Sequence, residues 1–263
     1  MLKTISNRLY SDYLLPDRLN ILGKLVKSAL EVGYDHRTIS KHFHQLGTNP
    51  KASVDRVFMH RTDVDTDAGT ARKMFEVFKS FGITSTFYFR RCTVDVSLMR
   101  ELNDAGFEVG YHYEEIADFC KDQRRIDPIL VTKAIPELRV RFLRNLKSME
   151  TAAGFKFSSV ASHGDFVNRK LGIPNHTLLD ADLIAEAGLL VEAYNPVLLD
   201  SLTDYTSDAS YPLFYRQGLS PFDAISKGSK AVLFLTHPRH WHAAPWINFK
   251  DTLLRLKEGL LTR

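Results

Sequence analysis

Short apolar runs alternate with segments of helical periodicity along most of this chain. The apolar runs predict strands at 57–59, 85–89, 107–113, 158–162, 189–194, 213–215 and 231–236. Apolar residues spaced three or four apart predict helices at 16–31, 70–81, 96–105, 136–153, 178–187 and 247–261. Strands that alternate with helices require parallel pairing through right-handed crossovers, so the pattern predicts an α/β fold with its helices outside.

The strand–helix units fit either an incomplete (β/α) barrel or a doubly wound sheet. In both folds, catalytic residues belong at the carboxyl ends of the strands, so the residues just after each apolar run matter most. Residues 1–53 precede the first strand and contain one helix followed by a polar stretch rich in histidine. We therefore expect two parts, an N-terminal helical extension at 1–53 packed on a barrel domain at 54–263.

Charge and cysteine content exclude several classes of protein. The net charge of +4 is spread along the chain without a basic cluster, which argues against nucleic-acid binding. Charged residues interrupt the first 24 positions, which argues against the apolar region of a secretory signal there. No apolar run approaches the length of a transmembrane segment. Cys92 and Cys120 are too few for a disulfide framework. We expect a cytoplasmic protein, and nothing in the sequence indicates its oligomeric state.

Histidine or aspartate stands at the end of four predicted strands. Asp63 and Asp65 follow the first strand, His112 ends the third, His163 follows the fourth, and His237 follows the last. Because the carboxyl ends of parallel strands meet at one rim, these side chains are expected to converge. Imidazole and carboxylate together suit Zn²⁺ or a similar divalent ion. Such an ion activates water for hydrolysis, with a carboxylate as base and a histidine as acid.

Three motifs resemble those of a known family. They are Asp63-Val64-Asp65, Glu108-Val109-Gly110-Tyr111-His112-Tyr113-Glu114 and Leu233-Phe234-Leu235-Thr236-His237-Pro238. Over residues 56–241 the chain resembles the polysaccharide deacetylase (NodB-homology, carbohydrate esterase) family, metal-dependent hydrolases that remove N- or O-acetyl groups from sugars. The resemblance implies a distorted (β/α)7 barrel with helices outside. It also implies one divalent metal ion, Asp63 as base, Asp65 and His112 as metal ligands, and His237 as acid.

The chain departs from this family at two motifs. The second metal-binding histidine, expected four residues after His112, is replaced by Ile116. The third ligand is then His163 or Glu114, and we favour His163 because imidazole is the commoner zinc ligand. The family's Arg-Pro-Tyr motif is replaced by residues 162–166, which leaves the sugar and the acyl group open. With these departures, the chain resembles divergent members of the family, some of which are associated with surface-polysaccharide biosynthesis.

Other positions have more than one interpretation. Arg61 shares the strand face of Asp63 and Asp65, and we expect it to pair with one of them. The two aspartates could instead cap the helix that follows. Trp241 could stack on a sugar or pack within its loop.

The sequence therefore predicts a zinc-dependent hydrolase acting on an acetylated sugar or glycan precursor. Motifs for dinucleotide binding, P-loop chemistry, serine hydrolysis and zincin proteolysis are absent from the sequence. Two alternatives stay open. One is a hydrolase of a non-sugar amide, and the other is a non-catalytic carbohydrate-binding or assembly protein on the same barrel.

Overall fold

A single parallel sheet organises the molecule. The computed structural model describes residues 2–48 and 56–262. Its strands are β1 (Asp35–His36), β2 (Val57–Val64), β3 (Thr86–Phe89), β4 (Glu108–Tyr113), β5 (Ser159–Ser162), β6 (Val191–Glu192), β7 (Asp204–Ser207) and β8 (Ala231–Thr236). Seven of them run in the order β6-β5-β4-β3-β2-β8-β7, and β1 adds to β2. All these pairs are parallel.

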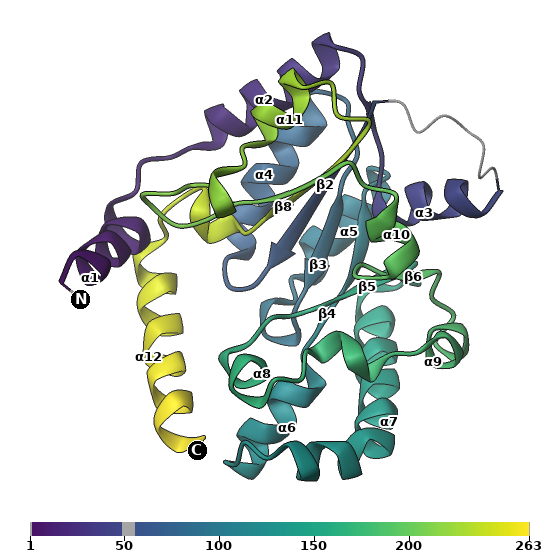
Figure 1. Ribbon diagram of the computed structural model, residues 1–263, viewed down its shortest axis with the longest axis vertical. Helices are drawn as coiled ribbons and strands as arrows, with labels where there is room; N and C mark the ends of the chain where they lie inside the picture. The colour runs from purple at the N-terminus through teal and green to yellow at the C-terminus, as the bar shows by residue number, and fades with distance from the viewer. Residues whose placement is uncertain (1, 49–55, 263) are drawn as a thin grey trace.

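Helices cover the outside of this curled sheet (Figure 1). They are α1 (Leu2–Leu9), α2 (Leu19–Glu31), α3 (Ile39–Thr48), α4 (Ala68–Ser80), α5 (Val96–Asp104), α6 (Glu115–Gln123), α7 (Pro128–Ala153), α8 (Phe166–Leu171), α9 (Ala181–Glu186), α10 (Pro196–Asp200), α11 (Pro221–Ser226) and α12 (Pro245–Leu261). The prediction of an α/β fold with a distorted (β/α)7 barrel and external helices is confirmed. In the described part of the chain, β6 and β7 form the two unpaired ends of the strand order, so the barrel is open.

The two faces of β2 have different environments. Phe58 and Val64 belong to the large core between the sheet and its outer helices. Val57 and Met59 instead pack inside the curl of the sheet with Leu233 and Leu235 of β8. Because side chains alternate along a strand, the inner face continues from these apolar residues to polar ones toward the carboxyl end.

Gly110 allows the interior of the barrel to be filled by an aromatic ring. A Cβ at this position would lie 2.3 Å from the carbonyl oxygen of Ser159 and 2.6 Å from the ring of Tyr88. The Tyr88 hydroxyl reaches the Ser159 hydroxyl at 2.6 Å. The absence of a side chain at Gly110 thus gives the inward-pointing tyrosine its space.

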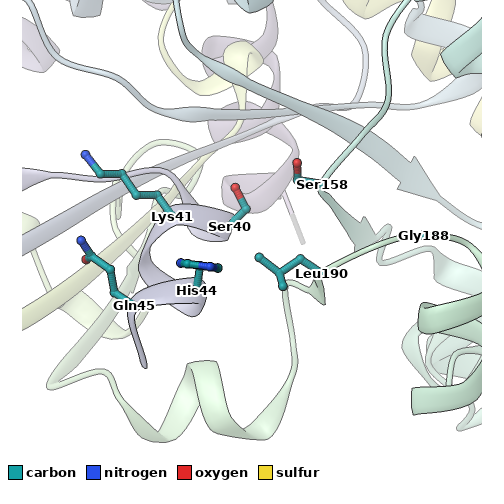
Figure 2. Close-up of a pocket in the computed structure, with 7 residues that line it drawn as sticks. All are labelled: Ser40, Lys41, His44, Gln45, Ser158, Gly188 and Leu190. Atoms are coloured by element: carbon teal, nitrogen blue, oxygen red, sulfur yellow. The ribbon is translucent and has the colours of Figure 1, made fainter. Parts of the chain in front are cut away.

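Helix α3 closes the amino end of the barrel. Glu108 accepts hydrogen bonds from the backbone N–H of Ser40 (3.0 Å), the Thr86 hydroxyl (2.9 Å) and the Ser159 hydroxyl (2.5 Å). A pocket of about 330 Å³ lies beside this helix (Figure 2), and it is lined by Ser40, Lys41, His44, Gln45, Ser158, Gly188 and Leu190. The predicted division of the chain near residue 53 falls outside the described residues and stays a prediction.

Candidate metal centre

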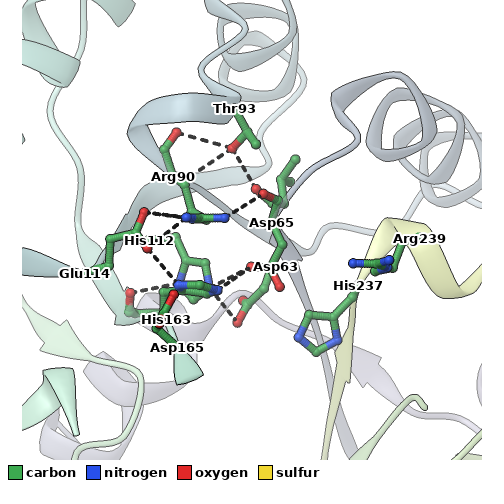
Figure 3. A network of polar contacts seen from close by, with 12 residues as sticks. Asp63, Asp65, Arg90, Thr93, His112, Glu114, His163, Asp165, His237 and Arg239 are labelled. Atoms are coloured by element: carbon green, nitrogen blue, oxygen red, sulfur yellow. Dashed lines mark hydrogen bonds and ion pairs between the residues drawn. The ribbon is translucent and has the colours of Figure 1, made fainter. Parts of the chain in front are cut away.

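Asp65, His112 and His163 lie together at the carboxyl ends of three strands (Figure 3). His112 is in β4, and the other two residues directly follow β2 and β5. One possible ligand atom from each residue lies within 4.8 Å of the others. Asp65 Oδ1 is 3.2 Å from His112 Nε2 and 3.6 Å from His163 Nε2. The convergence predicted from the strand ends is therefore present for these three side chains.

Both imidazoles are fixed through their Nδ1 atoms. His112 Nδ1 lies 2.9 Å from the carbonyl oxygen of Ala161, which can only accept a hydrogen bond. His163 Nδ1 lies 2.9 Å from Glu114 Oε2. When Nδ1 carries the proton of a neutral imidazole, Nε2 presents a lone pair, and both Nε2 atoms face Asp65. Metal-binding histidines in proteins are held in the same manner.

The donor atoms of this group fit a cation. Asp65 Oδ1 is buried and accepts no hydrogen bond from any residue in 2–48 or 56–262. In the tautomers that carry the proton on Nδ1, the Nε2 atoms of His112 and His163 beside it are acceptors as well, so three electron-pair donors face one another. A buried acceptor without a partner is costly unless a cation or a proton donor satisfies it. One carboxylate and two imidazoles form a ligand set typical of a catalytic zinc site, in which a fourth position stays open.

Glu114 lies behind His163. Arg90 binds both of its oxygens, with Nε and Nη2 at 2.8 Å from Oε1 and Oε2 respectively. Burial opposes ionisation of Glu114, but the hydrogen bond from His163 and the Arg90 guanidinium hold its pKa below the usual value. Arg90 also donates to the backbone oxygen of Asp65 at 3.1 Å. Of the two candidate third ligands, the structure groups His163 with Asp65 and His112, and places Glu114 where it orients His163.

Asp63 is held by a buried arginine on the same strand face. Arg61 donates from Nε to Oδ1 at 2.9 Å and from Nη2 to Oδ2 at 2.8 Å. Its guanidinium also lies over the rings of Tyr194 and Tyr88, at 4.7 and 5.4 Å from their centroids. Burial opposes ionisation of Asp63, but Arg61 and then His112 hold its pKa below the usual value. Asp63 is therefore a carboxylate at neutral pH, and its Oδ2 lies 3.4 Å from His112 Nε2.

His237 stands on the other side of Asp63 and Asp65 from His163 (Figure 3). Its Nδ1 lies 2.7 Å from Asp208 Oδ1, and its backbone N–H donates to Asp208 Oδ2 at 2.7 Å. Burial disfavours the imidazolium, but the Asp208 carboxylate raises the pKa of His237 to about 9. His237 is therefore protonated at neutral pH, with Nε2 left to donate.

Asp208 is a site residue that the sequence did not reveal. It is fully buried and also accepts from the indole Nε1 of Trp241 at 2.9 Å, while His240 Nδ1 lies 3.0 Å away. It directly follows β7, a short polar strand that was not predicted because it contains no apolar run. Trp241 is itself fully buried, so its indole supports Asp208 and leaves no exposed face for a sugar.

No protein-family model and no curated protein matches the chain, whereas several solved structures do. A family 4 carbohydrate esterase from Streptomyces lividans is 14% identical, with 75% of this chain and 88% of that chain covered and a TM-score of 0.39. A CE4 family pseudoenzyme from Bacillus anthracis is 14% identical, with 78% and 62% covered and a TM-score of 0.37. A peptidoglycan N-acetylglucosamine deacetylase is 12% identical, with 80% and 85% covered and a TM-score of 0.41.

The matched structures are deacetylases, esterases and pseudoenzymes of the kind that the sequence resembles. The chain spans only 62% of the length of the Bacillus anthracis protein. With such identities and TM-scores, these likenesses decide neither the activity nor the substrate of this chain.

Proposed function

We propose that this protein is a metal-dependent hydrolase that removes an N- or O-linked acetyl group from a sugar or surface-polysaccharide precursor. One observation carries the proposal. Three groups with complementary chemistry meet at one end of the sheet: the donor set of Asp65, His112 and His163, the ionised Asp63 and the protonated His237. Hydrolysis of an amide or ester needs electrophilic assistance, a base and an acid, and each group can supply one of these.

Asp65, His112 and His163 would hold the divalent ion. Zinc is the expected ion because two imidazoles and one carboxylate match its preferences. When bound, the ion polarises the acyl carbonyl and makes a neighbouring water more acidic. Glu114 and the Ala161 carbonyl keep the two imidazole rings in the orientation that points both Nε2 atoms at Asp65.

Asp63 accepts the proton of the attacking water. Arg61 binds both carboxylate oxygens and so fixes the plane of the carboxylate beside the donor set. Since its pKa is lowered, the carboxylate stays ionised at neutral pH and is ready to take a proton. The same low pKa makes Asp63 a weak base, so its contribution depends on the fixed position that the two hydrogen bonds from Arg61 give to its carboxylate.

His237 donates a proton to the departing amine or alcohol. Asp208 holds Nδ1, so the proton that moves is the one on Nε2. An amine or alkoxide leaves poorly without protonation, and a pKa of about 9 keeps the donor charged at neutral pH. Buried Asp208 stays fixed by its contacts to His237 and Trp241, which holds the imidazole in place.

Acetate release from N-acetylated and O-acetylated oligosaccharides tests the proposal. Asp63→Asn and His237→Ala are each expected to lower kcat/KM by about a hundredfold or more while the bound metal is retained. Asp182→Asn and His44→Ala, which alter exposed residues away from the site, are the matched controls. Wild-type activity in Asp63→Asn would remove the base from the mechanism, and a metal-loaded protein that releases no acetate would contradict the proposed function.

A further inference from the structure

Helix α12 presents a row of large apolar side chains to the outside of the molecule. Trp246, Phe249, Leu253, Leu256 and Leu260 are each between 43% and 72% exposed. They are spaced by three and four residues, so they share one side of the helix. A soluble domain seldom leaves such a continuous apolar surface uncovered, and one that persists usually marks an interaction site.

The side of α12 that rests on the protein is polar. Asp251 binds Arg239 at 3.0 Å, Glu258 binds Lys121 at 3.1 Å, and the Asn248 amide donates to the backbone oxygen of Asp12 at 2.7 Å. Asn248 is the one helix residue between 245 and 261 that is fully buried. An ordinary surface helix buries its apolar side and exposes its polar side. This helix does the reverse, with specific polar contacts that hold it in that orientation.

The charges left on the outer side of α12 are positive. Its two acidic residues, Asp251 and Glu258, are both engaged in ion pairs with the rest of the protein. Lys250 and Lys257 point outward among the apolar side chains, and the Lys250 ammonium lies 5.1 Å from the centre of the Trp246 ring. Exposed leucine, phenylalanine and tryptophan combined with lysine are typical of helices that lie in a membrane interface.

The N-terminal helices beside α12 also expose apolar side chains. Ile5 and Leu9 of α1, and Leu14 of the π-helical segment η1 (Tyr10–Leu14), are 53–70% exposed. The η1 segment contacts α12, and Asp12 within it binds Arg239 next to the start of α12. Figure 1 shows α1 close to the upper end of α12. Two helices from different parts of the chain thus lie close together, and both expose apolar side chains.

A second copy of the chain fits this surface less well than a lipid headgroup layer does. Face-to-face pairing of two α12 helices would bring Lys250 and Lys257 of both copies together with no acidic residue to compensate them. Exposed Ile247, Leu254 and Leu261 also widen the apolar surface beyond the narrow seam that a coiled coil uses. No helix within residues 2–48 and 56–262 is long and apolar enough to cross a membrane.

We propose that α12, with α1 beside it, docks this protein onto an anionic membrane surface. The apolar side chains would enter the headgroup–acyl boundary, and Lys250 and Lys257 would contact anionic headgroups. Helix α12 begins only eight residues after His237, so docking places the carboxyl ends of the strands near the membrane. A membrane-borne acetylated glycan would then be the substrate class. This last step rests on the proposed function, whereas membrane binding is measured without any turnover.

Sedimentation with lipid vesicles tests the docking surface. We expect the full chain to bind vesicles of phosphatidylcholine with phosphatidylglycerol, and to bind phosphatidylcholine alone far less. Leu253→Glu combined with Leu256→Glu should lower the partition coefficient by about tenfold or more. Each change removes apolar area that the membrane would cover and adds a negative charge that anionic headgroups repel. Lys250→Gln and Lys257→Gln should each weaken binding by about fivefold and reduce its salt dependence.

Val140→Glu is the matched control, because it puts the same charge on an apolar residue that is 65% exposed on α7. It should bind vesicles as the wild type does. The proposal would be overturned if the double glutamate variant bound vesicles as the wild type does. It would also be overturned if the wild type bound neither kind of vesicle. Light scattering on the same samples detects the competing outcome. In that case the wild type would be a dimer that binds no lipid, and the double glutamate variant would be a monomer. Either failure leaves the acetate-release experiment unaffected.

Discussion

Buried partners hold Asp63 and His237 in opposite charge states. Arg61 keeps Asp63 ionised, and Asp208 keeps His237 protonated. Arg61 lies within β2, and Asp208 directly follows β7, so the two partners come from different strands. At neutral pH the site therefore holds both a proton acceptor and a proton donor, which acid–base catalysis by two separate residues requires.

This arrangement predicts the pH dependence of catalysis. The proton on His237 is present below its pKa of about 9, so kcat/KM should fall as pH rises through that value. In Asp208→Asn the carboxylate is gone while burial still disfavours the imidazolium, so the alkaline fall should move toward neutral pH. Asp200→Asn, at an exposed position, should leave the profile unchanged. An identical alkaline limb in wild type and Asp208→Asn would show that Asp208 does not control the acid.

At the scale of elements, the strands buried on both faces were predicted best. The run 231–236 coincides with β8, and 57–59 lies within the longer β2. β7 was missed because it has the polar sequence Asp-Tyr-Thr-Ser at an end of the sheet, where little apolar surface is needed. The strand predicted at 213–215 was wrong, because Phe214 adopts a positive φ and only Tyr215 makes an isolated bridge.

Whether a site residue could be predicted depends on whether the strand before it contains an apolar run. Asp65, His112 and His163 follow apolar runs, so the rule that chemistry lies at strand ends was enough to select them. Asp208 follows a strand without an apolar run, so no pattern along the chain distinguished it from other aspartates. Its role depends on β7 lying beside β8, which is a property of the sheet order.

Packing between β4 and its neighbours leads to a prediction about Gly110. Gly110→Ala would put a methyl group 2.3 Å from the Ser159 carbonyl, so β4, β5 or Tyr88 must shift. We expect a loss of about 1–3 kcal/mol in the free energy of unfolding, measured by urea denaturation. Gly259→Ala, where a Cβ meets nothing within 4 Å, should be neutral or slightly stabilising. Equal stability of the two variants would contradict the packing described here.

At the scale of the whole molecule, two histidines outside the site link stability to pH. His36 and His60 stack with ring centroids 5.2 Å apart, and all four ring nitrogens are buried without a hydrogen-bond partner among the described residues. Burial lowers the pKa of His36 to about 4 and that of His60 well below its usual value. In the folded protein both rings are therefore neutral under mildly acidic conditions.

Stability should consequently fall as the solution becomes acidic. Below the unfolded-state pKa of about 6.5, the unfolded chain binds protons at these two positions that the folded chain does not bind. The neutral His36 ring should lower the free energy of unfolding by up to about 1.4 kcal/mol per pH unit between pH 6.5 and pH 4, and the fully buried His60 ring should act in the same direction. Urea unfolding of His60→Phe should show a shallower pH dependence than wild type, and exposed His44→Phe should match wild type. A pH dependence that is unchanged in His60→Phe would contradict this assignment.

The metal centre is the claim on which the proposed chemistry depends. Elemental analysis should be made on protein purified without chelator or nickel resin and then supplied with zinc. We expect about one ion per chain in the wild type and in the control His44→Ala, and loss of the ion in His112→Ala and His163→Ala. Glu114→Gln should still bind at saturation, with affinity lowered by about 10–100-fold, because Glu114 only orients His163.

Two results would contradict this account of the site. If the wild type binds no divalent ion even in excess zinc, Asp65, His112 and His163 are not a metal centre. If His163→Ala keeps its ion and Glu114→Gln loses it, the third ligand is Glu114 and the grouping described here is wrong. One ion per chain, lost on removal of either imidazole, is the result that the arrangement of Asp65, His112 and His163 predicts.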